Sequence, residues 1–194
     1  MINQNFVYLG AIIFFIGSVG YIIKTLQGKI KPNKVTWFLW ALAPLIAFAA
    51  QIKQGVGLQS LLTFMVGFMP IIIFLASFVN KKSYWKIERS DLICGSLSIF
   101  GLIAWQITKV GNIAIIFSIV ADFLAGWPTF VKSFKYPETE NYLIYLGNAI
   151  FASITLLTIK VWNFETYSFS LYLFVVTLLI AIIIKFKVKK LFNK

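Results

Sequence analysis

The chain has 194 residues, of which 60% are hydrophobic and 12% are charged, and it carries a formal net charge of +12 at pH 7. A water-soluble domain does not expose so much apolar surface, so the composition predicts a protein embedded in a membrane. With no histidine and the single cysteine Cys94, the sequence excludes an internal disulfide and offers no cysteine and histidine set for a metal site.

Seven apolar stretches follow one another along the chain, and each is about as long as one helical crossing of a bilayer. They span residues 6–23, 35–52, 61–79, 92–108, 113–131, 142–159 and 167–184. Seven crossings of about 20 residues leave only short loops and tails. The predicted fold class is therefore all-α, a polytopic membrane protein with seven transmembrane helices. The first stretch is expected to be retained, because no basic residue precedes it and no small-residue cleavage pattern follows it.

Basic residues are distributed unequally between the gaps that separate these stretches. Fifteen of the eighteen lysines and arginines follow the first, third, fifth or seventh stretch, and only Lys53, Lys109 and Lys160 lie in the other gaps. Since cytoplasmic loops carry the excess of lysine and arginine, the pattern predicts a multi-pass protein of the plasma (inner) membrane with an outside N-terminus and a cytoplasmic C-terminus. The net charge then reflects topology and contact with anionic lipids, so membrane lipids are expected partners and nucleic acid is not.

The first three stretches resemble the last three. Residues 20–24 align with residues 128–132, and an aromatic pair three residues apart then opens both the second and the sixth stretch. The repeat predicts a 3+1+3 arrangement, with a first three-helix bundle at 1–79, a loop and linker helix at 80–110 and a second bundle with a basic cytoplasmic tail at 111–194. With one helix between them, the two triplets enter the membrane in the same direction, as in transporters built from parallel repeats. Chance similarity between apolar segments is the alternative explanation.

Residues 128–135 read Pro-Thr-Phe-Val-Lys-Ser-Phe-Lys. Together with the seven-helix pattern, this segment resembles the SWEET and PQ-loop superfamily, in which a Pro-Gln pair near the cytoplasmic end of the first helix of each bundle precedes basic residues. Pro128 and both basic positions, the first of them Lys132, are kept, whereas Thr129 replaces the glutamine and the first repeat matches only at Lys24. The resemblance implies two three-helix bundles that move sugars, amino acids or other small solutes, while related folds act as cargo receptors. The Trp and Asn residues of the sugar-transporting members have no evident counterpart here.

Asp122 is the only acidic residue that lies deep inside an apolar stretch. A carboxyl group in hydrocarbon is costly and is by default functional, so Asp122 is predicted to couple transport to protons. Ser118 lies on the same helical face, in a stripe of small and polar residues that is predicted to face the protein interior or a water-filled cavity. The stripe also includes Ala125, Gly126 and Thr129. The alternative role for Asp122 is a hydrogen bond between packed helices.

Aromatic and amide side chains lie at similar positions in the second and sixth stretches. The second stretch places five residues on one helical face, namely Trp37, Trp40, Pro44, Ala47 and Gln51, and the sixth places Tyr142, Tyr145 and Asn148 similarly. We expect Trp40, Tyr145 and Asn148 to line a solute-binding cavity together with Ser118, through ring stacking and amide hydrogen bonds. Trp37 and Tyr142 lie nearer the cytoplasmic interface and are expected to anchor the protein there.

These features together predict a transporter of a small polar solute, of the sugar or amino acid class. Pro44 and Pro128 each remove a helical hydrogen bond within the membrane, so they are predicted hinges for alternating access between the two bundles. Both a proton-coupled carrier and a facilitator fit the pattern. The alternatives are a non-transporting membrane receptor or scaffold of the same fold and a membrane subunit of a larger complex, and a homo-oligomer is compatible with each.

An enzyme is not expected. The six acidic residues and the single cysteine provide no nucleophile with an adjacent base, and no catalytic or metal-binding residues are predicted. No glycine-rich phosphate loop is present, so no nucleotide or other cofactor is expected.

Overall fold

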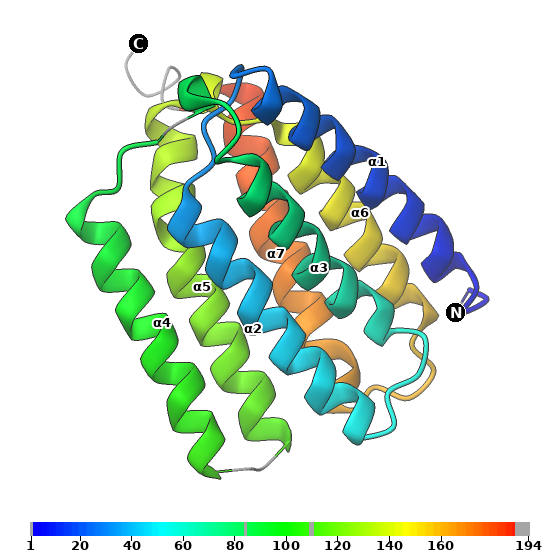
Figure 1. Cartoon of the computed structure of the whole chain (residues 1–194). Helices are drawn as coiled ribbons and strands as arrows, with labels where there is room; N and C mark the ends of the chain where they lie inside the picture. The colour runs from blue at the N-terminus through cyan, green and yellow to red at the C-terminus, as the bar shows by residue number, and fades with distance from the viewer. Residues whose placement is uncertain (1, 84, 109–110, 189–194) are drawn as a thin grey trace.

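The computed structural model describes residues 2–83, 85–108 and 111–188, and within these ranges the regular structure is entirely helical (Figure 1). The helices are α1 (Phe6–Leu26), α2 (Lys34–Lys53), α3 (Ser60–Ala76), α4 (Arg89–Thr108), α5 (Gly111–Lys135), α6 (Tyr142–Thr158) and α7 (Phe164–Phe186), with 3-10 turns η1 (Lys81–Ser83) and η2 (Pro137–Thr139). Each predicted apolar stretch coincides with one α-helix, so the all-α prediction is confirmed. Residues 109–110, at the end of the predicted loop and linker segment, and the part of the basic tail from 189 onward lie outside the described residues.

Among the described residues, four helices are long and apolar enough to cross a membrane, namely α1, α2, α7 and residues Asn112–Lys135 of α5. α3 and α6 have 17 residues each, which gives about 26 Å at the usual helical rise, slightly less than the hydrocarbon core of about 30 Å. Large apolar side chains such as Ile16 and Leu75 are more than half exposed on the helix surfaces. The four long apolar helices are compatible with the membrane protein that the composition predicts.

The packing of the helices follows a regular pattern. α3 packs against α1 and α2, and α7 packs against α5 and α6. Two further contacts join these groups, since α1 packs along α6 and α2 packs along α5 (Figure 1). α4 lies mainly against α5, with a smaller contact to α2.

Glycines allow the long contact between α1 and α6 to be close. A Cβ atom added at Gly10 would lie 2.5 Å from Phe151 Cδ2, and one added at Gly17 would lie 3.2 Å from the Leu143 carbonyl oxygen. Any larger side chain at Gly10 would therefore push α6 away from α1, so backbone approach at these positions helps to fix how the two groups of helices meet.

α2 and α6 both begin at a buried asparagine with extended backbone conformation. The Asn33 side chain accepts hydrogen bonds from the backbone N–H groups of Val35 and Thr36, at 3.1 and 3.3 Å. Asn141 accepts one from Leu143 at 3.3 Å. These N-caps satisfy N–H groups that have no partner within the helix, and they fix where each helix starts. They thereby set which side chains of α2 and α6 face the interior.

Candidate functional site

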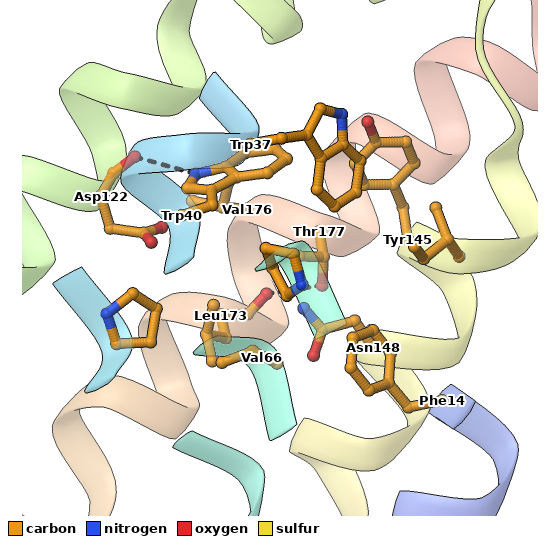
Figure 2. Close-up of a pocket in the computed structure, with 13 residues that line it drawn as sticks. Phe14, Trp37, Trp40, Val66, Asp122, Tyr145, Asn148, Leu173, Val176 and Thr177 are labelled. Atoms are coloured by element: carbon orange, nitrogen blue, oxygen red, sulfur yellow. Dashed lines mark hydrogen bonds between the residues drawn. The ribbon is translucent and has the colours of Figure 1, made fainter. Parts of the chain in front are cut away.

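A cavity lies among six of the helices, and each α-helix except α4 contributes to its lining among the described residues (Figure 2). The lining residues are Phe14, Trp37, Trp40, Pro44, Val66, Pro70, Asp122, Ile144, Tyr145, Asn148, Leu173, Val176 and Thr177. The centres of water molecules can occupy about 40 Å³ of this cavity. One water needs about 10 to 15 Å³ by this measure, so the cavity holds a few waters and the helices must separate to admit a larger solute.

The lining is built from matching positions in α1–α3 and α5–α7. The same number of residues separates Phe14 from Asp122, Trp37 from Tyr145 and Trp40 from Asn148, and one residue fewer separates Val66 from Leu173 and Pro70 from Thr177. The sequence alignment of residues 20–24 with 128–132 has the first of these two offsets. At this offset Trp37 corresponds to Tyr145, and not to Tyr142 as in the predicted match of the two aromatic pairs. The positions are equivalent at this offset, but only the α5–α7 members include a carboxyl, an amide and an aliphatic hydroxyl.

The Asp122 carboxyl group is buried and has a hydroxyl partner. Tyr172 of α7 donates a hydrogen bond from Oη to Asp122 Oδ2 at 2.8 Å, and the Trp40 indole N–H donates to the Asp122 backbone carbonyl at 3.1 Å. Among the described residues, no lysine or arginine lines the cavity. The carboxyl group therefore has one hydroxyl bond and no cation beside it in the cavity, which leaves acceptor capacity for a proton or a solute.

Asn148 places an unpaired acceptor in the same cavity. Its side chain is buried, and within the described part of the chain its Oδ1 atom has no hydrogen-bond partner. Figure 2 shows Asn148 on the opposite side of the view from Asp122, beside Thr177. Buried carbonyl oxygens without a partner are uncommon because desolvating them costs free energy, so this atom is available to accept a hydrogen bond from a bound molecule.

Four aromatic rings form a cluster at one side of the cavity. Ring centroids are separated by 4.9 Å between Tyr21 and Trp37, 5.3 Å between Trp37 and Trp40, and 6.3 Å between Trp40 and Tyr145. Trp37 is 3% exposed. The expectation that Trp37 anchors the protein at the membrane interface is therefore wrong, because its ring is enclosed between Tyr21 and Trp40.

Trp40 also makes a close contact with α5. A Cβ atom added at Gly126 would lie 2.9 Å from Trp40 Cζ2, so the ring lies directly on this glycine. With the indole N–H bonded to the Asp122 carbonyl, the ring is held by packing on one side and by a hydrogen bond at its edge. α2 and α5 are thus fixed to each other beside the cavity.

A buried ion pair lies next to the aromatic cluster. Lys132 Nζ is 2.6 Å from Glu140 Oε1, with side-chain exposures of 1% and 0%, and Lys132 also donates to the Lys31 carbonyl. Tyr21 and Tyr145 donate hydrogen bonds to Glu140 Oε2 at 2.9 and 3.2 Å. Tyr145 therefore links the ion pair directly to the cavity. Lys132 was a predicted site residue because it belongs to the motif. Glu140 was not predicted, because an acidic residue in a loop is normally solvated.

The predicted site residues do not all meet. Trp40, Tyr145, Asn148, Asp122 and Pro44 line the cavity together, whereas the other predicted residues, Ser118, Pro128, Thr129 and Lys132, lie outside its lining. Ser118 is buried in the predicted stripe of α5, and its hydroxyl group has no partner in the part of the chain that the structure describes.

Thr129 belongs to the contact between α2 and α5. It donates to Thr36 Oγ1 at 3.1 Å, and Thr36 in turn donates to the Ala125 carbonyl at 2.8 Å. Pro128 and Lys132 line a separate hollow at the loop end of α5. Tyr172 was not predicted as a site residue, and its hydroxyl group within an otherwise apolar part of the seventh stretch is the signal that would have indicated it.

Comparisons with protein-family models, curated proteins and solved structures give no match to this chain. The described residues contain no group of three or more histidine, cysteine, aspartate or glutamate side chains that could hold a metal ion. The cavity, the buried ion pair and the sequence features are therefore the observations that bear on the function of this chain.

Proposed function

We propose that this chain is a seven-helix membrane transporter of a small polar solute, which passes through the cavity by alternating access. The observation that carries the proposal is the placement of the Asp122 carboxyl and the unpaired Asn148 oxygen together in one cavity inside an apolar protein. Polar groups at such depth are costly, and packing alone does not require them. Because both groups can accept hydrogen bonds, the cavity suits a solute that carries N–H or O–H donors.

A 3+1+3 arrangement of two related bundles is supported by which helices pack together. Exchanging α1, α2 and α3 for α5, α6 and α7 converts the α1–α3, α2–α3 and α1–α6 contacts into the α5–α7, α6–α7 and α2–α5 contacts. The N-caps Asn33 and Asn141 are also exchanged. α4 has no counterpart in this exchange, as expected of a helix that links two repeats. Membership in the SWEET and PQ-loop superfamily is proposed on the sequence motif together with this packing pattern.

The proposed topology places the N-terminus outside and the C-terminus in the cytoplasm, across the plasma (inner) membrane. The α1–α2, α3–α4 and α5–α6 connections and the end of α7 gather at one end of the molecule (Figure 1). These are the segments that carry most lysines and arginines, so this end is proposed to face the cytoplasm.

The Lys132–Glu140 pair and the four aromatic rings are proposed to close the cytoplasmic side of the cavity. Tyr145 contacts both Glu140 and the cavity, so opening this side would separate the rings and disrupt the hydrogen bonds to Glu140. The two charges are buried, and parting them without water would be costly. Pro44, which lines the cavity, and Pro128, one turn before Lys132, are the proposed hinges.

Uptake into liposomes would test the proposal. The purified full chain would be reconstituted and assayed with labelled sugars, amino acids and amines, with and without an inward proton gradient. Asp122→Asn keeps the size of the side chain but removes its acid, and Glu138→Gln is the matched control, because Glu138 is an exposed acid of the η2 turn. We expect gradient-dependent uptake that Asp122→Asn abolishes and Glu138→Gln preserves.

The other possible results of the uptake assay distinguish between the alternative functions. Uptake that needs no gradient and survives Asp122→Asn would indicate a facilitator in which Asp122 only packs helices. Absence of uptake for every solute would contradict transport and favour a non-transporting receptor or scaffold. The small volume of the cavity is the observation that favours a scaffold, because it lies far below the range of about 300 to 1,000 Å³ for pockets that hold drug-sized ligands.

A further inference from the structure

An apolar groove runs over the outer surface of the molecule between α3 and α4, with α2 beneath it. Its volume is about 470 Å³, and its lining includes Phe38 of α2, Phe74 of α3, Phe78 in the turn after α3, and Leu92 and Ile99 of α4. Phe38, Phe78, Leu92 and Ile99 are each between 42% and 58% exposed. The groove is separate from the proposed transport cavity and shares no lining residue with it.

The wall of the groove on the α3 side is a row of rings. The ring centroids of Phe38 and Phe74 are 5.4 Å apart, and those of Phe74 and Phe78 are 5.1 Å apart. α4 approaches α2 closely at the other wall, where a Cβ atom added at Gly95 would lie 2.9 Å from Val35 Cγ1. The result is an elongated apolar surface bounded on two sides, which an extended hydrocarbon chain would fill better than water.

One end of the groove is positively charged. A second hollow of about 320 Å³, lined by Lys34, Ser77, Phe78, Asn80 and Lys81, adjoins the groove through the shared residues Lys34 and Phe78. The Lys34 ammonium group lies 3.8 Å from the centroid of the Phe78 ring, where the two meet. None of the six acidic residues of the chain lines either hollow.

We propose that the groove binds an anionic phospholipid, with an acyl chain along the phenylalanine row and the phosphate beside Lys34 and Lys81. An apolar groove that ends at two basic side chains matches the polarity of such a lipid. An apolar partner helix would match the phenylalanine row but would supply no anionic group for the basic end of the groove. The inference does not depend on transport, since a receptor of the same fold would bind the lipid equally.

Native mass spectrometry of the full chain in detergent would test this site. The probes are phosphatidylglycerol and phosphatidylcholine with identical acyl chains. The double variant Lys34→Gln/Lys81→Gln should bind phosphatidylglycerol about thirtyfold more weakly than the wild type. Lys53→Gln/Lys160→Gln removes the same charge at the opposite end of the molecule and should keep the wild-type affinity.

A third variant tests the groove itself. Ser96 lines the groove and is exposed, so Ser96→Phe should fill it without disturbing the fold and should weaken phosphatidylglycerol binding at least tenfold with both lysines present. This variant decides the question if the lysine variant does not fold. Equal wild-type affinity for the two lipids, equal loss in the two double variants, or unchanged binding by Ser96→Phe would each overturn the proposal.

Discussion

The cavity is lined by two sets of side chains that occupy equivalent positions but differ in chemistry. In α1–α3 these positions hold Phe14, Trp40 and Pro70, and in α5–α7 they hold Asp122, Asn148 and Thr177. Apolar rings and proline stabilise a protein by packing, whereas a buried carboxyl and an unpaired amide oxygen do not. The two sets of helices therefore contribute differently to the cavity: α1–α3 supply apolar packing, and α5–α7 supply the polar groups that would contact a solute in the proposed transporter.

A similar difference applies at the cytoplasmic end in the proposed topology. Lys24 and Lys132 are equivalent in the alignment, but only Lys132 has a buried carboxylate partner, Glu140. At the offset that relates Lys24 to Lys132, Pro32 occupies the position that corresponds to Glu140. A residue of one half can therefore serve as the control for a variant in the other half, at the equivalent position in the case of Lys132 and Asp122, and three such comparisons are open to measurement.

The largest expected loss of unfolding free energy comes from removing one partner of the buried ion pair. Lys132→Gln would leave the Glu140 carboxylate buried without its counter-charge, which typically costs about 3 to 5 kcal/mol of unfolding free energy. Lys24→Gln removes the same charge at the equivalent, half-buried position and should change stability by less than about 0.5 kcal/mol. Reversible unfolding in mixed detergent micelles would compare them. Equal stability of the two variants would show that Lys132 and Glu140 do not act as a pair.

A smaller loss is expected where Trp40 meets α5. Gly126→Ala would place a methyl group 2.9 Å from the Trp40 ring and should cost about 1 to 3 kcal/mol through overpacking. Gly20→Ala is the matched control, because a Cβ atom there would have no neighbour within 4 Å. In an α-helix this control should be neutral or slightly stabilising. The same unfolding assay applies, and a Gly126→Ala protein as stable as the control would contradict the close contact.

The smallest effect on stability is expected within the cavity, where function should respond instead. Asp122→Asn keeps an acceptor for the Tyr172 hydroxyl and should change unfolding free energy by less than about 1 kcal/mol. Phe14→Leu, at the equivalent position, should cost about 1 kcal/mol by reducing packing. Solute uptake should fall more than tenfold for Asp122→Asn and stay within about threefold for Phe14→Leu. The reverse order in the uptake assay would refute this difference between the two sets of helices.

The positions of the helices were predictable because hydrocarbon excludes charged side chains. The interior stripe of α5 was predictable because residues three or four positions apart lie on the same face of a helix. The five stripe residues are all buried, as predicted, and the helices coincide with the apolar stretches. The partners of the charged groups were not predictable. Glu140 accepts a hydrogen bond from Tyr21 of α1, which is far away in the sequence, and Asp122 accepts one from Tyr172 of α7. Such pairs depend on how helices cross, which local sequence does not determine.

The prediction that Trp37 anchors the protein at the membrane interface was wrong for the same physical reason. A tryptophan near the predicted end of a membrane helix is typical of an interfacial anchor when only depth is considered. Its actual environment is set by Tyr21 of α1, whose ring lies 4.9 Å away, and by Trp40 one turn along α2. The rings therefore pack with one another and not with headgroups, because tertiary packing brings the Tyr21 ring of α1 against the Trp37 ring of α2.

The buried Lys132–Glu140 pair also bears on whether protons and small ions would leak through the protein when no solute is bound. A continuous file of water is what protons and small ions need in order to cross a protein. The pair is almost fully excluded from solvent, and Tyr21, Trp37 and Tyr145 cover it on the cavity side. If the protein spans the plasma membrane as proposed, this conformation without bound solute would not dissipate the electrochemical gradient of the cell, so many copies could be present without an energetic penalty to their host.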